Sequence, residues 1–304
     1  MINSKNIMNE DSNKNILQVK NLNKTFKEFK LQNINFSLEK GYIMGLIGPN
    51  GSGKTTLIKI LMGLMKSDSG DISIFGLDKN DKKNCIPIKE RIGFVYDENY
   101  FYEELTVKAT KNFIAPFYKN WNEDKFIQLQ NNFNLPENRK VKELSKGMKM
   151  KLSLALALAH NPDLIIMDEP TSGLDPVFRS EVLDILRDVI QNEEKGILFS
   201  SHITNDLDKI ADYITFINNG EMVFSKSKEE IGDEFLLVRG DTTLLESFGE
   251  DERDCFISIK KNAFGFDGLS KDPGKVKKFC GDGALYEKAS LEDIMVYYAR
   301  AGEK

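Results

Sequence analysis

The sequence predicts an α/β fold with an antiparallel β subdomain, a helical insertion and a small α+β region at the C-terminal end. Three observations lead to this prediction. The apolar run 42–47 is followed by a glycine-rich turn and a helix-forming segment. A second apolar run, 164–167, ends in two acidic residues, and the segment 96–160 between the runs has helical patterns. Apolar strands that alternate with helices are typical of a mostly parallel sheet.

The glycine-rich turn 48–56 fits the pattern G-x-x-x-x-G-K-[ST], which marks a phosphate-binding loop. Glycines let the backbone adopt positive φ, so that successive N–H groups form an anion cradle at the start of a helix. We expect Lys54 to reach the β- and γ-phosphates of a nucleotide and the Thr55 hydroxyl to bind Mg²⁺. The strand before the turn and the helix after it disfavour a turn without a ligand. The residues expected at the phosphates are Gly48, Asn50, Gly51, Ser52, Gly53, Lys54, Thr55 and Thr56.

The second apolar run predicts a buried parallel strand that ends at Asp168 and Glu169. Ligands of open α/β sheets bind at the carboxyl ends of the strands. Asp168 is therefore expected to hold Mg²⁺, directly or through water. Glu169 is expected to polarise an attacking water, as a general base or as a positioning group. A strand that merely ends in solvated acids is the alternative, but together with the phosphate-binding loop the motif predicts a P-loop NTPase core.

Composition limits the class of protein. The 304 residues are 40% hydrophobic and 29% charged, which is typical of a globular chain. The net charge of −5 and the absence of a dense basic cluster argue against nucleic acid as a partner. No run of 18 apolar residues predicts a membrane span, and the polar N-terminus predicts no secretion signal. Three cysteines without metal-ligand spacing, Cys85, Cys255 and Cys280, predict reduced thiols in a cytosolic protein.

The remaining elements follow in chain order. A loose tail is expected over 1–15 and a main domain over 16–230. Strands are expected at 16–19 and 34–38 as an antiparallel edge, then at 42–47, 72–76, 92–95, 164–167, 197–200, 213–216 and 222–224. Residues 79–90 predict a polar loop. Helices are expected near 56–62, 111–119, 125–133, 146–159, 178–191 and 204–210.

The region 231–304 predicts a separate accessory unit, because the composition shifts near residue 230. Strands are expected at 234–238 and 255–259, and a terminal helix at 291–299. No chemistry is evident here, so we interpret the region as a dimerisation or stabilising element.

With these motifs in place, residues 17–231 resemble the ATP-binding subunit of an ABC transporter. Residues 171–175 are similar to the D-loop of that family, and His202 is similar to the switch histidine that contacts the γ-phosphate. Residues 144–148 stand where the family has Leu-Ser-Gly-Gly-Gln. The resemblance implies that Phe26 stacks on adenine, and that Ser145, Gly147 and Asp175 also contribute to nucleotide binding.

The resemblance also implies partners. An ATP hydrolase of this kind dimerises on ATP with a second copy of itself or a homologous ATPase subunit. It drives a transmembrane permease subunit at the cytoplasmic face of the membrane. The aromatics of 96–121 would grip a short helix of that subunit, with the core of the helical region as the alternative. These aromatics are Tyr96, Tyr100, Phe101, Tyr102, Phe113, Phe117, Tyr118 and Trp121.

Two positions depart from the family pattern. The signature segment has Lys146 for a glycine and Met148 for a glutamine. Asp97 stands where the family has a glutamine, and a carboxylate can reach Mg²⁺ through water but cannot donate as an amide does. We predict Asp97 as a catalytic and metal-site residue. Sequences of this kind resemble exporters of drugs, bacteriocins and peptides.

Three other functions stay open as alternatives. An ABC ATPase acting on ribosomes or nucleic acid would have tandem cassettes or a long coiled coil, and neither is present. A P-loop GTPase or kinase would leave Ser145, the D-loop and His202 unexplained. A nucleotide-binding regulator without hydrolysis is disfavoured because Glu169 and His202 are both present.

Overall fold

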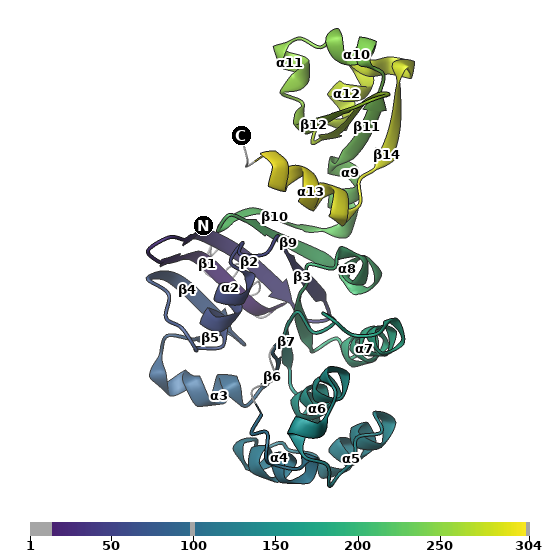
Figure 1. Ribbon diagram of the computed structural model, residues 1–304. Coiled ribbons are helices and arrows are strands. Elements are labelled where there is room, and N and C mark those ends of the chain that lie inside the picture. The colour runs from purple at the N-terminus through teal and green to yellow at the C-terminus, as the bar shows by residue number, and fades with distance from the viewer. Residues whose placement is uncertain (1–13, 98–100, 302–304) are drawn as a thin grey trace.

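The computed structural model describes residues 14–97 and 101–301, so that most of the predicted tail, as well as Tyr100, lies outside the described residues. A ten-stranded sheet forms the middle of the molecule, with strand order β5-β4-β1-β2-β10-β9-β3-β8-β7-β6. Figure 1 shows this sheet between a group of helices at one end and a second sheet at the other. The α/β prediction is therefore confirmed.

The strands that hold the site are parallel neighbours. They are β3 (Ile43–Ile47), β8 (Gly196–Ser200), β7 (Leu164–Asp168) and β6 (Ile92–Val95). Every residue of β3, β7 and β8 is buried, which explains their unbroken apolar sequences. Their carboxyl ends meet at one edge of the sheet, directly before the glycine-rich turn, the acid pair and the His202 loop. This edge is where the predicted catalytic groups converge.

Side chains of these strands alternate between two layers of core. Met44, Leu46 and Ile166 pack with α2 (Lys54–Leu61) and with the antiparallel strands β1 (Asn15–Thr25), β2 (Lys30–Glu39) and β4 (Ser69–Ile74). Ile165 and Met167 pack with α6 (Lys146–Ala159), α7 (Pro176–Ile190) and α8 (Thr204–Ile210) on the other face. The period of two along each strand produces this division. The predicted antiparallel pairing of β1 with β2 is confirmed.

The helical segment contains α4 (Val107–Ile114), η2 (Ala115–Phe117), α5 (Glu123–Asn132), η3 (Val141–Glu143) and α6. The loop predicted over 79–90 is wrong in part, since η1 (Lys82–Asn84) and α3 (Cys85–Lys89) lie within it. The Asp81 carboxylate accepts from the N–H of Lys83 and starts this helical turn, and the buried Ile88 anchors it. This segment is too short and too polar to show the apolar periodicity from which a helix is predicted. The strand β5 (Leu77–Asp78) precedes it, pairing with β4.

Beyond β9 (Tyr213–Asn218) and β10 (Glu221–Ser227), helix α9 (Lys228–Glu234) leads to a four-stranded antiparallel sheet. Its order is β12 (Phe256–Asn262), β13 (Gly265–Ser270), β11 (Leu236–Gly240) and β14 (Ala284–Lys288). Helices α10 (Thr242–Glu246), α11 (Glu250–Arg253) and α12 (Pro273–Cys280) and the turn η4 (Gly281–Gly283) join these strands. The predicted strands at 234–238 and 255–259 begin one to two residues later than expected, while β13, β14, α10, α11 and α12 were not predicted.

The last helix, α13 (Leu291–Ala301), returns to the main sheet. The ring of Tyr298 packs edge-on against that of Phe216, with centroids 5.4 Å apart, and also contacts Phe235. The second sheet has its own aromatic core around Phe248 and Phe266. Among the described residues, none of the helices has the length and hydrophobicity to cross a bilayer.

His160 is the C-cap residue of α6 and is buried in the interior. It is 1% exposed, its ring stacks on Tyr118 with centroids 3.8 Å apart, and its Nε2–H donates to the carbonyl of Ile92. Burial lowers the pKa of His160 to about 4. Between that value and the ordinary pKa near 6.5, the unfolded chain binds the proton more readily than the folded chain.

The free energy of unfolding should therefore fall as pH falls from about 6.5 to about 4, by up to ~1.4 kcal/mol per pH unit through His160. Urea unfolding of the parent chain and of His160→Gln across this range measures the contribution as the difference between the two slopes. The variant should show the shallower slope. Parallel curves would contradict the assignment.

Candidate nucleotide site

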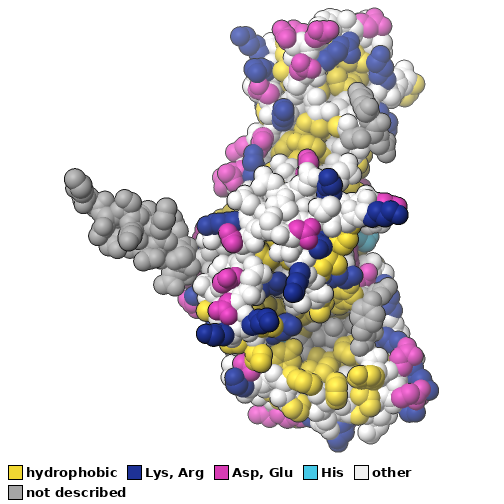
Figure 2. Space-filling model, turned by 90° about the vertical axis from the view of Figure 1, so that its left-hand side faces the viewer, with side chains coloured by type: hydrophobic (Ala, Val, Ile, Leu, Met, Phe, Trp, Pro, Cys, Tyr) yellow, Lys and Arg dark blue, Asp and Glu magenta, His cyan; other side chains and the backbone are white. Residues whose placement is uncertain are grey.

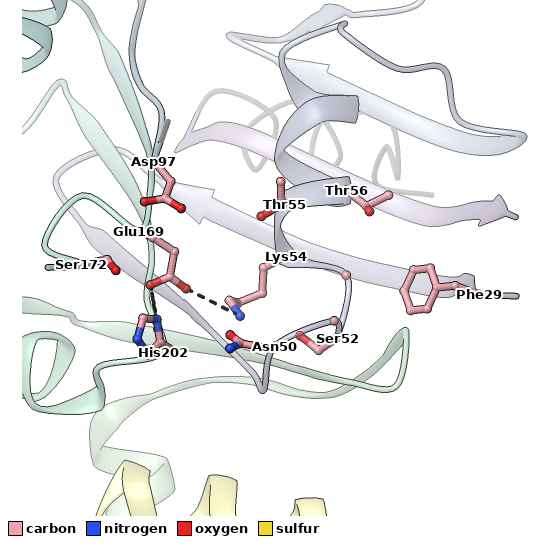
Figure 3. A pocket seen from close by; sticks show the side chains of 12 residues that line it. Phe29, Asn50, Ser52, Lys54, Thr55, Thr56, Asp97, Glu169, Ser172 and His202 are labelled. Carbon is pink, nitrogen blue, oxygen red and sulfur yellow. Dashed lines mark hydrogen bonds and ion pairs between the residues drawn. The ribbon is translucent and has the colours of Figure 1, made fainter. Parts of the chain in front are cut away.

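A pocket of about 390 Å³ opens at the carboxyl edge of the parallel strands, between the glycine-rich loop and the loops after β6, β7 and β8 (Figure 3). Most of the site residues that the sequence predicts line this pocket. The lining consists of Phe29, Asn50, Gly51, Ser52, Gly53, Lys54, Thr55, Thr56, Asp97, Glu169, Ser172 and His202.

The loop has the backbone that its glycines predict. Gly48, Gly51 and Gly53 have φ of 155°, 80° and 112°. A Cβ at Gly48 would lie 2.1 Å from the carbonyl oxygen of Ile217, so no other residue fits there. Around Gly51 there is open space, which leaves room for a ligand to approach the backbone. The Ser52 hydroxyl is buried and has no hydrogen-bond partner among the described residues, as expected of a group that binds a phosphate oxygen.

Lys54 lies at the start of α2 and points across the loop. Its Nζ donates to the carbonyl oxygen of Gly48 at 2.8 Å and lies 3.7 Å from Oε1 of Glu169. Burial lowers the pKa of Lys54, and the charge of Glu169 works in the opposite direction. The ammonium group of Lys54 can exchange these contacts for phosphate oxygens with little rearrangement.

Asp168 is buried at the end of β7. The Ser200 hydroxyl donates to its Oδ1 at 2.7 Å, and the Thr55 side chain also hydrogen-bonds to the carboxylate. Burial raises the pKa of Asp168, while these two hydrogen bonds lower it. The structure thus brings together Thr55 and Asp168, two of the three predicted metal-site residues, and the third, Asp97, lines the pocket.

This donor set fits Mg²⁺. The ion prefers oxygen ligands and usually binds one or two carboxylates together with water and substrate phosphates, so a hydroxyl beside a carboxylate suffices. Within the described part of the chain, no group of three or more His, Cys, Asp or Glu side chains forms a ready-made metal cage. Nucleotide oxygens would complete the coordination.

Glu169 has a strained backbone, with φ of 50°. Its N–H donates to the carbonyl oxygen and to the hydroxyl of Ser200, both at 3.1 Å, and these bonds hold the strained position. One carboxylate oxygen faces Lys54. The other accepts from the N–H of His202 at 3.1 Å and from its Nδ1 at 2.6 Å. Figure 3 shows the carboxylate between the side chains of Lys54 and His202. Glu169 and His202 thus form one unit.

Three of the predicted binding residues lie at the starts of helices away from the glycine-rich loop. Ser145 and Gly147 are at the start of α6, where the exposed Ser145 caps the helix by accepting from the N–H of Met148. The carboxylate of Asp175 caps α7 by accepting from the N–H groups of Val177 and Phe178. None of the three lines the pocket of its own chain.

The aromatic and hydroxyl groups at the pocket differ from those predicted. Phe29 lines the pocket, whereas the predicted Phe26 does not. The rings of Phe26 and Phe29 are neighbours, with centroids 6.1 Å apart. Ser172 also lines the pocket and was not predicted as a site residue. Both signals were in the sequence, because Phe29 shares the β1–β2 turn with Phe26, and Ser172 follows Glu169 by three residues.

Comparison with known proteins agrees with this geometry. The family model described as ABC transporter matches residues 31–172. The ATP-binding protein YtrB of Bacillus subtilis is 32% identical over 209 residues, which are 69% of this chain and 70% of YtrB. The chain belongs to the ABC transporter family. It is thus an ATP-binding protein of that family and an ATPase.

Two further matches are informative. The lantibiotic transport ATP-binding protein SrtF of Streptococcus pyogenes is 34% identical and covers 69% of this chain and 90% of its own. A solved dimeric structure of the ATP-binding cassette MJ0796, bound to ADP and Pi, has a TM-score of 0.63 and 25% identity. It covers 69% of this chain and 98% of its own. These comparisons confirm the P-loop NTPase core within the predicted α/β fold.

Proposed function

We propose that this chain is the ATP-hydrolysing motor subunit of an exporter, which dimerises on ATP and drives a separate transmembrane subunit from the cytoplasmic face of the membrane. The observation that most supports hydrolysis is the position of Glu169. Its carboxylate is fixed by Lys54 on one side and His202 on the other, 3.7 and 2.6 Å away, beside the Thr55–Asp168 pair.

The residues divide the chemistry among them. The N–H groups of the loop and Lys54 bind the phosphates of ATP and neutralise their charge. Glu169 accepts the proton of the attacking water, and His202 holds the carboxylate in place through Nδ1. The Thr55 hydroxyl and the Asp168 carboxylate would hold Mg²⁺, which would supply positive charge to the phosphate oxygens. Asp97 contributes a carboxylate on the same side of the pocket.

A second ATPase subunit completes this proposal. Ser145 and Gly147 lie at an exposed helix start outside the pocket of their own chain, so they can act on a nucleotide only when another molecule supplies it. The free N–H groups at that end of α6 are suited to an anion. The dimeric MJ0796 cassette supports the same arrangement. Lys146, exposed beside Ser145, adds a positive charge where the family has glycine.

A membrane partner is proposed for the aromatic surface, which we define as Tyr102, Phe113 and Phe117. These side chains are 67%, 50% and 66% exposed, and their rings pack edge-on with centroids 5.6 and 5.8 Å apart. Figure 2 shows hydrophobic side chains gathered at this helical end of the molecule. An exposed patch of this kind suits an apolar helix of a partner.

The other described aromatics of 96–121 take different positions. Tyr118 stacks on His160, Trp121 packs on Phe126, and Phe101 packs against the main core. The alternative of a helical-region core therefore applies to these residues. Because Phe101 packs against the core, Phe101→Ala would disturb that packing. Phe117→Ala tests the surface more directly.

We expect Phe117→Ala to leave the ATPase rate of the purified chain unchanged and to weaken assembly with the membrane subunit by about tenfold, since a large apolar contact is lost. Phe264→Ala is the matched control, because Phe264 is 93% exposed in the turn between β12 and β13 of the second sheet. Assembly measured by co-purification should be normal in the control. Equal assembly of both variants would exclude this surface as the contact.

The whole proposal is tested by purifying Glu169→Gln with ATP from native membranes and identifying what accompanies it. A hydrophobic protein with several membrane spans is the expected companion. Export of a peptide or drug is supported by the lantibiotic transport relative, and uptake or extrusion assays on the isolated complex would test it. Co-purification with ribosomes or nucleic acid would overturn the motor function in favour of an ABC ATPase that acts on those partners.

A further inference from the structure

A second pocket, of about 180 Å³, lies at the far end of α2 from the nucleotide site. It shares no lining residue with that site. Its floor is apolar and its rim is cationic, and none of the described residues that line it is acidic. The lining consists of Leu61, Met62, Gly63, Met65, Lys66, Lys79, Asn80, Lys82, Cys85, Ile88, Lys89 and Ile92.

The floor is built from two elements that pack together. Leu61 ends α2, Ile88 lies in α3, and both side chains are buried, as is that of Ile92 at the start of β6. Met62 and Met65 are only partly buried and expose flexible apolar surface to the pocket. The floor can therefore accept an aliphatic group.

Four lysines surround this floor without an ion pair. Lys66, Lys79, Lys82 and Lys89 take part in no salt bridge within the described residues. Lys79 and Lys89 converge over Gly63: a Cβ built there would lie 4.0 Å from Cε of Lys79 and 4.0 Å from Nζ of Lys89. Burial, with a smaller contribution from the nearby charge of Lys89, lowers the pKa of Lys79.

The helix end does not explain these charges. Lysines can serve to cap the last carbonyls of a helix. Here the carbonyls of Lys59 and Ile60 already accept from the backbone N–H groups of Leu64 and Gly63, at 2.9 and 3.0 Å. Two converging ammonium groups, one of them half-buried, are therefore left with a mutual repulsion that an anion would relieve.

We infer that this pocket binds an amphiphilic anion, a phosphate or carboxylate joined to an aliphatic chain. The anionic group lies between Lys79 and Lys89, and the chain lies on Met62, Met65 and Ile88. Figure 2, in which the α3 side of Figure 1 faces the viewer, shows Lys and Arg side chains with hydrophobic side chains between them on this part of the surface. A lipid headgroup and a soluble metabolite both offer this chemistry.

Octyl phosphate, used below its micelle concentration, is the probe, with octanol and inorganic phosphate as the two half-ligands. Cys85 is exposed in the lining and provides a local readout. We expect octyl phosphate to slow alkylation of Cys85 by iodoacetamide, followed by peptide mass spectrometry. Alkylation of Cys255, which is only partly exposed and lies elsewhere, should not change. Each half-ligand should bind at least about tenfold more weakly than octyl phosphate.

Lys79→Gln/Lys89→Gln should raise the dissociation constant of octyl phosphate about tenfold or more, measured by calorimetry. Lys260→Gln/Lys261→Gln is the matched control, because it removes two exposed lysines from the second sheet. Binding no tighter than that of octanol, or equal binding by both double variants, would overturn the inference.

Vesicles then separate the two sources. A bilayer lipid is supported if the protein floats with phosphatidylcholine vesicles that contain phosphatidic acid and not with pure phosphatidylcholine vesicles. Lys79→Gln/Lys89→Gln should then lose this flotation. Octyl phosphate binding without flotation supports a soluble ligand of the same chemistry.

Discussion

Replacing Glu169 by glutamine should lower the turnover number for ATP hydrolysis by about 10²–10⁴-fold while leaving ATP binding intact. The amide keeps the size of the side chain and can still contact Lys54 and His202, but it cannot accept a proton from water. Because hydrolysis would no longer reopen the dimer, the ATP-bound dimer should accumulate. Phosphate release measures the rate, and size-exclusion chromatography with ATP measures the dimer.

Glu246→Gln is the control for the loss of a negative charge, since this glutamate is exposed on α10, away from the pocket. Its turnover should equal that of the parent chain. If Glu169→Gln also hydrolysed ATP at the parental rate, Glu169 would not be the general base and the proposed division of chemistry would be wrong.

Replacing Lys54 by alanine should raise the dissociation constant for ATP by about 10–100-fold, because a charge-assisted bond contributes roughly 1.5–3 kcal/mol. The effect should depend on the phosphates, so affinity for adenosine should not change. Binding can be followed by calorimetry with ATP, ADP and adenosine. A parallel loss for all three ligands would indicate a damaged fold and not a lost phosphate contact.

Lys59→Ala is the matched variant. Lys59 lies on the same helix, α2, but its Nζ is 5.8 Å from the centre of the Tyr96 ring and it does not line the pocket. It should bind ATP like the parent chain. Unchanged ATP affinity in Lys54→Ala would show that the glycine-rich loop has been assigned the wrong role.

Local sequence was sufficient where a feature depends on neighbours in the chain. The glycine-rich loop needs glycines at set positions before a helix, and the three φ angles agree with that reading. Buried parallel strands have uninterrupted apolar sequences, so β3, β7 and β8 were predictable. The polar segment 79–90 was not, because η1 and α3 depend on the Asp81 cap and on Ile88 reaching the core. Likewise, β13 and β14 each pair with β11, which is distant from both in sequence.

The sequence by itself determined the family of chemistry: a phosphate-binding loop, an acid pair after a buried strand and a histidine after the next. Only the tertiary structure decided how these groups meet. The register of β7 beside β8 places Ser200 against both acids, and the strained backbone of Glu169 turns its carboxylate between Lys54 and His202. The same folding places Phe29 at the pocket, puts Ser145 outside it and gathers the lysines from separate segments around Met62. Contacts of this kind depend on packing between strands and helices far apart in the chain, which local sequence does not encode.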